Sequence, residues 1–164
     1  MDLTFERTPL FSVIPVAYRR LIRISAGYDL VVTAAFVTPW TYELLRKALS
    51  ALGLALGLGA MPAADPTGTM YANLMGSIVV VWATLRLIEP RRVFGLYDGV
   101  ARILFAIWEA YGALHGATGL LWGFFAVEVV FGVLQLAPWL PAHPPWPTRW
   151  FTARLRRNSR GSMP

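Results

Sequence analysis

Cysteine is absent from this chain of 164 residues, and charged residues make up only 15% of it. The absence of cysteine excludes disulfides, thiolate metal sites and thiol catalysis. The charged fraction is well below the value of about 25% that is usual in soluble domains. Hydrophobic residues, by contrast, make up 56% of the chain, and its mean hydropathy is +0.51. The composition therefore predicts a membrane protein of single-domain length.

The sequence also has few residues of the kinds that carry out catalysis or bind metals. It contains no HExxH motif, no CxxC motif and no Ser–His–Asp arrangement, so no reaction is indicated by motif. Its two histidines are His115, at the end of an apolar run, and His143, in a Pro-rich stretch. A transition-metal site would have to combine His115 with Glu109 or Asn73, and the usual ligand sets are richer. We therefore expect no metal and no cofactor, and the sequence favours a protein that is not an enzyme.

Apolar runs of roughly 20 residues, long enough to cross a bilayer, recur along the chain. They lie at about 20–40, 70–88, 93–114 and 118–139. The first is the least apolar because it contains Arg23 and Asp29. The segment at about 41–61 begins with charged residues and ends in a Leu/Gly/Ala run that is too short to cross. We interpret it as an interfacial or re-entrant helix on the outer face.

The basic residues predict how these runs are oriented. If the chain crosses four times and the 41–61 segment does not cross, all but three of the 15 lysines and arginines lie on one side or its flanks. The exceptions are Arg46, Lys47 and Arg102. Basic residues collect on the cytoplasmic side of membrane proteins, so the sequence predicts four spans with both termini in the cytoplasm. The net charge of +6 thus indicates a lipid bilayer as partner, and we expect no binding to nucleic acid.

The chain divides into one membrane domain, 20–139, and two flanking segments that we place in the cytoplasm. The first of these segments is 1–19. The second, 140–164, is Pro-rich and then basic, and it either lies on an anionic leaflet or is solvated. The excess of arginine over lysine and the many Ala, Gly and Leu residues point to a bacterial protein, and hence to the inner membrane.

Each predicted span carries polar residues at spacings of three or four, which place them on one face of a helix. The four faces contain Ser25, Asp29, Thr33 and Phe36; Asn73, Ser77, Val80 and Thr84; Asp98, Arg102, Phe105 and Glu109; and Leu121, Phe124, Glu128, Gly132 and Gln135. Ionisable side chains within spans nearly always face a bundle interior or a cavity. The sequence therefore predicts an all-α fold, an integral membrane four-helix bundle with a polar interior and an extra interfacial or re-entrant helix between the first and second spans.

The depths of these residues predict two polar levels. At a rise of about 1.5 Å per residue, Asp29, Arg102 and Glu128 lie near the middle of their spans, and Asn73 and Glu109 lie nearer the outside. Three acids then share the Arg102 guanidinium, and an unpaired carboxylate in hydrocarbon is costly. We predict that at least one of Asp29, Glu109 and Glu128 is protonated at neutral pH, unless a cation or a cationic ligand supplies the missing charge.

The candidate residues for a ligand site or polar network are the charged and amide side chains on these inward faces. They are Asp29, Asn73, Asp98, Arg102, Glu109, Glu128 and Gln135. Such residues either fix helix register and packing or form a functional pocket. Direct contact among Asp29, Arg102 and Glu128 would favour the first interpretation, and a void on the order of a few hundred cubic ångströms would favour the second. The aromatic residues near Glu128 leave open a pocket for a lipophilic ligand there.

The first span contains the segment "RISAGYDLVVTAAFVTP", with an early arginine, a small-residue turn and a terminal proline. In this segment, in its size and in its four spans, the chain resembles the DoxX-like group of small four-helix bacterial membrane proteins, over about Arg23–Gln135. The resemblance implies an accessory or associated subunit of a membrane redox system. It carries over no functional residue.

Three functions are compatible with the sequence. The first, which we predict, is a non-enzymatic accessory or partner-binding bundle whose partner is another membrane protein or a second copy. Gly119 and Gly123, in "GLLWG", let helices approach closely, either within the bundle or in a homodimer. The second function is a small proton- or cation-coupled transporter. The third is a lipophilic-ligand-binding or isomerase-like protein that uses the buried carboxylates.

Overall fold

The computed structural model describes residues 14–140, and every element in this part of the chain is a helix. The elements are α1 (Val16–Thr33), η2 (Ala34–Phe36), α2 (Pro39–Ala55), α3 (Pro66–Ile88), α4 (Arg92–Leu114), α5 (Leu121–Leu136) and η3 (Ala137–Trp139). The predicted all-α class is therefore confirmed. His143, nearly all of the predicted tail at 140–164 and most of the predicted segment at 1–19 lie outside the described residues.

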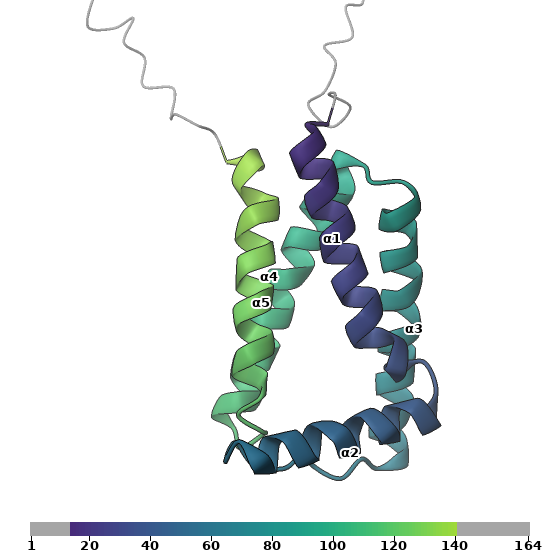
Figure 1. The fold of residues 1–164 in the computed structure, drawn as a ribbon, viewed down its shortest axis with the longest axis vertical. Coiled ribbons are helices and arrows are strands. Elements are labelled where there is room, and N and C mark those ends of the chain that lie inside the picture. Colours follow the sequence, from purple (N-terminus) through teal and green to yellow (C-terminus); the bar gives the residue numbers. More distant parts are fainter. Residues whose placement is uncertain (1–13, 141–164) are drawn as a thin grey trace, which may run out of the picture.

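Four helices run along the long axis of the molecule, and one lies across them (Figure 1). α1, α3, α4 and α5 alternate in direction, and α2 lies across one end of the group. The described chain begins and ends at the opposite end, which we call the terminal end. α1 packs mainly against α3, and α4 packs mainly against α5. The fold therefore consists of two helix pairs, the first pair (α1 and α3) and the second pair (α4 and α5).

A sharp bend separates the first helix from the second. The chain turns by 106° between Val16–Phe36 and α2. The residue before a proline favours an extended backbone, and Thr38, which precedes Pro39, has a ψ of 151°. The Thr38 hydroxyl accepts a hydrogen bond from the Thr41 amide at 3.2 Å and so caps α2. The segment "TPWT" thus determines the bend, because Pro39 favours an extended Thr38 and Thr38 caps α2.

The second helix is shorter than the segment 41–61 that the sequence predicts. It begins at Pro39, because proline is favoured in the first turn of a helix. It ends at Ala55. Beyond that point Gly57 and Gly59 have φ angles of +69° and +83°, in the left-handed region where glycine commonly terminates helices. The Leu/Gly/Ala run therefore forms a turn and a loop rather than the end of a longer helix.

The remaining helices also differ from prediction by a few residues at their ends. α3 begins at Pro66 rather than at 70, because the Asp65 carboxylate accepts a hydrogen bond from the Gly68 amide at 2.5 Å and caps the helix. α5 begins at Leu121 rather than at 118. Gly116, with a φ of +92°, provides the turn that precedes it.

Two helical segments are long and apolar enough to cross a membrane, namely Pro66–Ile88 and Leu121–Trp139. A third is added if Val16–Phe36 and Pro39–Ala55 are counted as one broken span. α4 has the same length as α3, 23 residues, but it is not among these segments, and it is the helix that carries Asp98, Arg102 and Glu109. The chain is thus a helical membrane protein with two to three candidate spans by length and composition.

The distribution of side chains supports the same class. Among the described residues, the largest fully buried side chains are Arg86, Arg102, Ile22, Gln135 and Ser25. Large apolar side chains lie on the outside instead, and Ile78, Val81 and Ile88 are each at least 70% exposed. A soluble domain buries apolar side chains and rarely buries charged ones. The reversed pattern is what a bilayer favours, because lipid solvates apolar surface and excludes charge.

Candidate functional site

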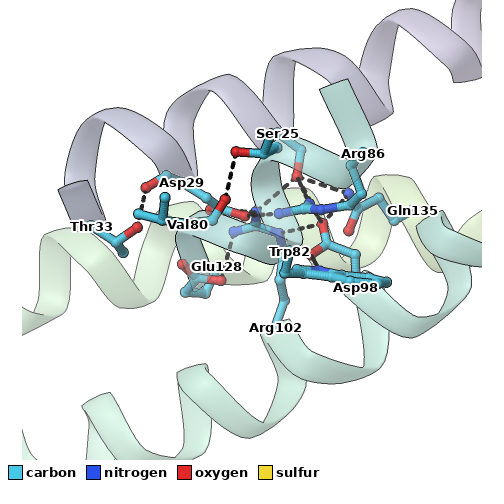
Figure 2. A network of polar contacts seen from close by, with 11 residues as sticks. Ser25, Asp29, Thr33, Val80, Trp82, Arg86, Asp98, Arg102, Glu128 and Gln135 are labelled. Atoms are coloured by element: carbon cyan, nitrogen blue, oxygen red, sulfur yellow. Dashed lines mark hydrogen bonds and ion pairs between the residues drawn. The ribbon is translucent and has the colours of Figure 1, made fainter. Parts of the chain in front are cut away.

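Arg102 of α4 lies at the centre of a buried polar network to which α1, α3, α4 and α5 all contribute (Figure 2). Its guanidinium donates to Glu128 Oε2 at 2.8 Å and to Asp29 Oδ1 at 2.7 Å. It also donates to the Ser25 hydroxyl at 2.8 Å. The structure therefore brings together the three charged residues that the sequence places near the middle of the spans. Arg102 is in direct contact with both acids.

Arg86 of α3 is a second buried guanidinium in the network, and sequence reasoning missed it. Its side chain is 0% exposed. It donates to Asp29 Oδ2 at 2.5 Å and forms an ion pair with Asp98. The guanidinium also lies 5.4 Å from the centre of the Trp82 ring, within the range of a cation–π contact. The prediction counts Arg86 among the basic residues on the cytoplasmic side, and the structure places its side chain inside the bundle instead.

Asp98 connects the network to the terminal end of the bundle. Arg102 lies one turn away on the same helix, and its guanidinium forms an ion pair with the Asp98 carboxylate at 3.4 Å. The carboxylate accepts shorter hydrogen bonds from Ser25 at 2.8 Å and from Gln135 at 2.6 Å. The Trp82 indole N–H donates to its other oxygen at 3.2 Å. Asp98 therefore contacts a polar group on each of the other three long helices.

Small residues allow the helices to approach closely enough for these contacts. A side chain at Gly95 would overlap the Tyr18 ring, and one at Gly99 would overlap the Leu136 side chain. The Tyr18 hydroxyl donates to the Gln135 carbonyl oxygen at 2.8 Å. The two helix pairs are thus joined at the terminal end by polar side chains that meet across glycine-lined contacts.

The charges in the network do not balance. Asp29, Asp98 and Glu128 face two guanidiniums rather than the single one that the sequence predicts. All five residues are at most 8% exposed. With every group ionised, these five residues carry one excess negative charge. The prediction that one acid binds a proton, or that a cation completes the site, therefore stays a prediction after Arg86 is counted.

The second polar level that the sequence predicts does not form a site. Asn73 donates its side-chain N–H to the Phe36 carbonyl oxygen at 2.6 Å, and so it satisfies a backbone group at the end of η2. Glu109 accepts no hydrogen bond within residues 14–140, and its Oε2 atom is buried there without a partner. The two side chains share neither a partner nor a cluster.

Two of the predicted inward faces need correction. Ser77 and Thr84 are exposed, and each donates its hydroxyl to a carbonyl one turn earlier in α3, at 2.8 Å. Serine and threonine hydroxyls commonly bond in this way within a helix, so they need no partner in an interior. The buried face of α3 instead contains Gly76, Val79, Ala83 and Arg86. In α4, Phe105 is 40% exposed and is not among the residues that this helix buries.

The geometry of the acidic and histidine side chains bears on metal binding. No group of three or more His, Cys, Asp and Glu side chains there is arranged to hold a metal ion. His115 bonds to the Tyr111 carbonyl oxygen at 2.8 Å and stacks on the Tyr111 ring with 4.0 Å between ring centres. It therefore has a local role at the end of α4.

No family model, no curated protein and no solved structure matches the chain. The resemblance to DoxX-like proteins therefore stays a prediction. The geometry of the network holds buried charges against each other.

Proposed function

We propose that this protein is an integral membrane four-helix bundle that acts as a non-enzymatic accessory or partner-binding subunit. The observation that carries the proposal is the direct contact of Arg102 with Asp29 and Glu128. Ion pairs that close on each other hold helices in register, whereas a transport path or a substrate pocket needs open space between the groups. The buried network then fixes the shape of the bundle, and its apolar exterior is available to lipid and to partner helices.

The surface of α4 supports its inclusion as a span. Asp98 and Arg102 are buried, with exposed fractions of 3% and 1%. The outward positions of α4 include Leu104, Ile107 and Trp108, each more than 50% exposed. Asp98 and Arg102, two of the charges that lower the hydropathy of α4, thus contact protein rather than lipid, and the length of α4 is sufficient for a span.

The distribution of basic residues supports an orientation with both termini in the cytoplasm. Among the described residues, Arg19 and Arg20 lie in the first turns of α1, and Arg91 and Arg92 lie at the start of α4; both helices begin at the terminal end. Only Arg46 and Lys47, on α2, belong to the opposite end. Because basic residues favour the cytoplasmic side, α2 would lie on the outer face. In a bacterial cell this membrane is the inner membrane.

The orientation can be tested by labelling single cysteines, since the natural chain has none. Lys47→Cys lies on α2 and Glu89→Cys lies at the turn between α3 and α4. We expect a membrane-impermeant maleimide to label the first in intact cells and the second only after the membrane is permeabilised. The unmodified chain is the control and should not react. Labelling of both positions from the same side would contradict the four-span arrangement.

The accessory role can be tested with a photo-crosslinking amino acid at an exposed position of α3. Ile78 and Val81, each 70% exposed, are suitable positions. We expect crosslinks to another membrane protein or to a second copy in native membranes. Proton flux through proteoliposomes should be the same for the natural chain and for Asp29→Asn. Crosslinks to lipid alone, or a proton flux that Asp29→Asn abolishes, would contradict the proposal.

A further inference from the structure

A groove of about 500 Å³ runs between the two helices of the second pair. Ile103 and Ile107 form one wall and Val129 and Val133 form the other. All four are at least 40% exposed, so the groove opens to the outside of the bundle. Its size lies in the range of about 300–1,000 Å³ that is usual for sites that bind small molecules.

The groove reaches the edge of the buried network. Arg102 and Glu128 are among its lining residues, although they are only 1% and 6% exposed. Glu128 Oε2 accepts a hydrogen bond from Arg102 at 2.8 Å. The other oxygen of this carboxylate, Oε1, has no hydrogen-bond donor among residues 14–140 and is not among the fully buried unpartnered atoms. Apart from Arg102 and Glu128 the lining residues are apolar, and the Glu128 carboxylate is more than nine-tenths buried and has unused acceptor capacity beside the Arg102 guanidinium.

The net charge of the network indicates what kind of group would bind to the Glu128 carboxylate. The network holds three acids against two guanidiniums, so a positively charged donor would balance it. A second carboxylate would add to the excess negative charge. Phe125 also lines the groove, and an aromatic ring can stabilise a cation nearby. The apolar walls select for a hydrocarbon chain.

We propose that this groove binds an amphipathic amine, with its ammonium group at Glu128 and its hydrocarbon chain between α4 and α5. The ammonium donates to the Oε1 atom of Glu128. The chain lies against Ile103, Ile107, Val129 and Val133. The site requires only that the second pair faces lipid, so it is independent of the accessory role proposed above.

The full-length protein in nanodiscs can be titrated with dodecylamine and followed by native mass spectrometry. Dodecanol and laurate carry the same chain length with a neutral and an anionic head, so they serve as matched probes. We expect one saturable site per chain, with dodecylamine bound about tenfold more tightly than dodecanol, since a charge-assisted hydrogen bond exceeds a neutral one by about that factor. Laurate should bind most weakly.

Two comparisons between variants test the contribution of the ligand's head group and that of its hydrocarbon chain separately. Val129→Trp fills the groove and should abolish binding, whereas Val130→Trp, at the neighbouring exposed position outside the groove, should leave it unchanged. Glu128→Gln should remove the tenfold preference for the amine and keep the binding of dodecanol. Equal affinities for all three probes would overturn the proposal and indicate a groove for acyl chains. Equal binding by the two tryptophan variants would overturn it even if Glu128→Gln does not fold.

Discussion

The two helix pairs are joined in different ways at the two ends of the molecule. At the terminal end, side chains with opposite charges cross between the pairs, as in the contact of Arg86 with Asp98. At the opposite end, the loop after α2 contacts the loop before α5 through the backbone. There the Gly119 amide donates to the Leu58 carbonyl oxygen at 2.7 Å, and the Thr118 hydroxyl donates to the Gly59 carbonyl oxygen at 3.1 Å. Figure 1 shows α2 lying across this end as a strap.

The difference shows what can hold helices together inside a bilayer. Lipid tails are as apolar as leucine, so burying apolar side chains between helices gives little driving force there. The pairs are therefore joined either by polar groups that lipid cannot solvate or by close backbone contacts between small residues. The first kind of contact should be expensive to break from one side, and the second should depend on shape. Three substitutions test this distinction.

The largest effect is expected for Arg86→Met. This change removes one guanidinium and leaves Asp29 and Asp98 with less compensation in a buried site. Loss of one partner of a buried ion pair typically costs about 3–5 kcal/mol. We expect the variant to unfold at a much lower detergent concentration or temperature than the natural chain, as followed by circular dichroism.

The control for this prediction is Arg91→Met. Arg91 forms an exposed ion pair with Glu89 at 2.6 Å, with both side chains more than half exposed. Exposed pairs contribute about 0–1 kcal/mol, so this variant should behave almost like the natural chain. Similar losses in the two variants would show that the buried network has no special role in joining the pairs.

A smaller effect is expected at the strap. A Cβ atom at Gly53 would overlap the Gly59 carbonyl oxygen and would lie 3.2 Å from the Thr118 hydroxyl oxygen. Gly53→Ala should therefore displace the loop from α5 and destabilise the bundle by about 1–3 kcal/mol, the usual cost of overpacking. Hydrogen exchange of the Gly119 amide should increase, because its hydrogen bond to Leu58 would be weakened. Gly123→Ala, where a Cβ would meet no atom within 4 Å, is the matched control, and equal effects at the two sites would contradict the role of the strap.

The smallest effect is expected on the exposed face of α2. Arg46 donates to both oxygens of Glu43, at 2.7 and 2.8 Å, and this lowers the pKa of the Glu43 carboxyl from 4.5 to about 2. A lowered pKa in the folded state stabilises the fold above pH 4.5, and that stabilisation is lost as the pH falls to about 2. We expect a small stability difference between the natural chain and Glu43→Gln that is constant from pH 7 to 4.5 and disappears below. A difference that grows on acidification would contradict this assignment.

The sequence predicts the existence and the order of the helices, and it places their ends only to within a few residues, although those ends depend on local chemistry. Pro39, Pro66 and Gly116 lie at or near helix ends, and their effects on the backbone do not depend on the rest of the fold. The inward faces of α1, α4 and α5 are also predictable in large part, since Asp29, Arg102 and Glu128 could be accommodated only away from lipid. The strongly polar residues within apolar segments are therefore the best predictors of which helix face points inward.

The predictions fail where the polarity of a residue does not determine whether its side chain faces the interior of the bundle. Ser77 and Thr84 are polar but satisfied by their own helix, so their spacing predicts the wrong face of α3. Arg86 lies next to a basic turn, and the positive-inside rule assigns it to that turn although it points inward. Asn73 and Glu109 lie at similar predicted depths, but depth along a span does not specify the rotation or tilt that would bring two side chains together.

The ion pair between Asp29 and Arg86 lies within the first pair alone. In the proposed four-span arrangement, and for a chain that is inserted as it is synthesised, α1 and α3 reach the membrane before α4 does. The opposite charges of Asp29 and Arg86 neutralise each other at that stage. Neither residue is therefore left as an unpaired charge in hydrocarbon before Arg102 and Asp98 are inserted. We expect this early neutralisation to make the first half of the chain competent for insertion by the translocation machinery without the second half.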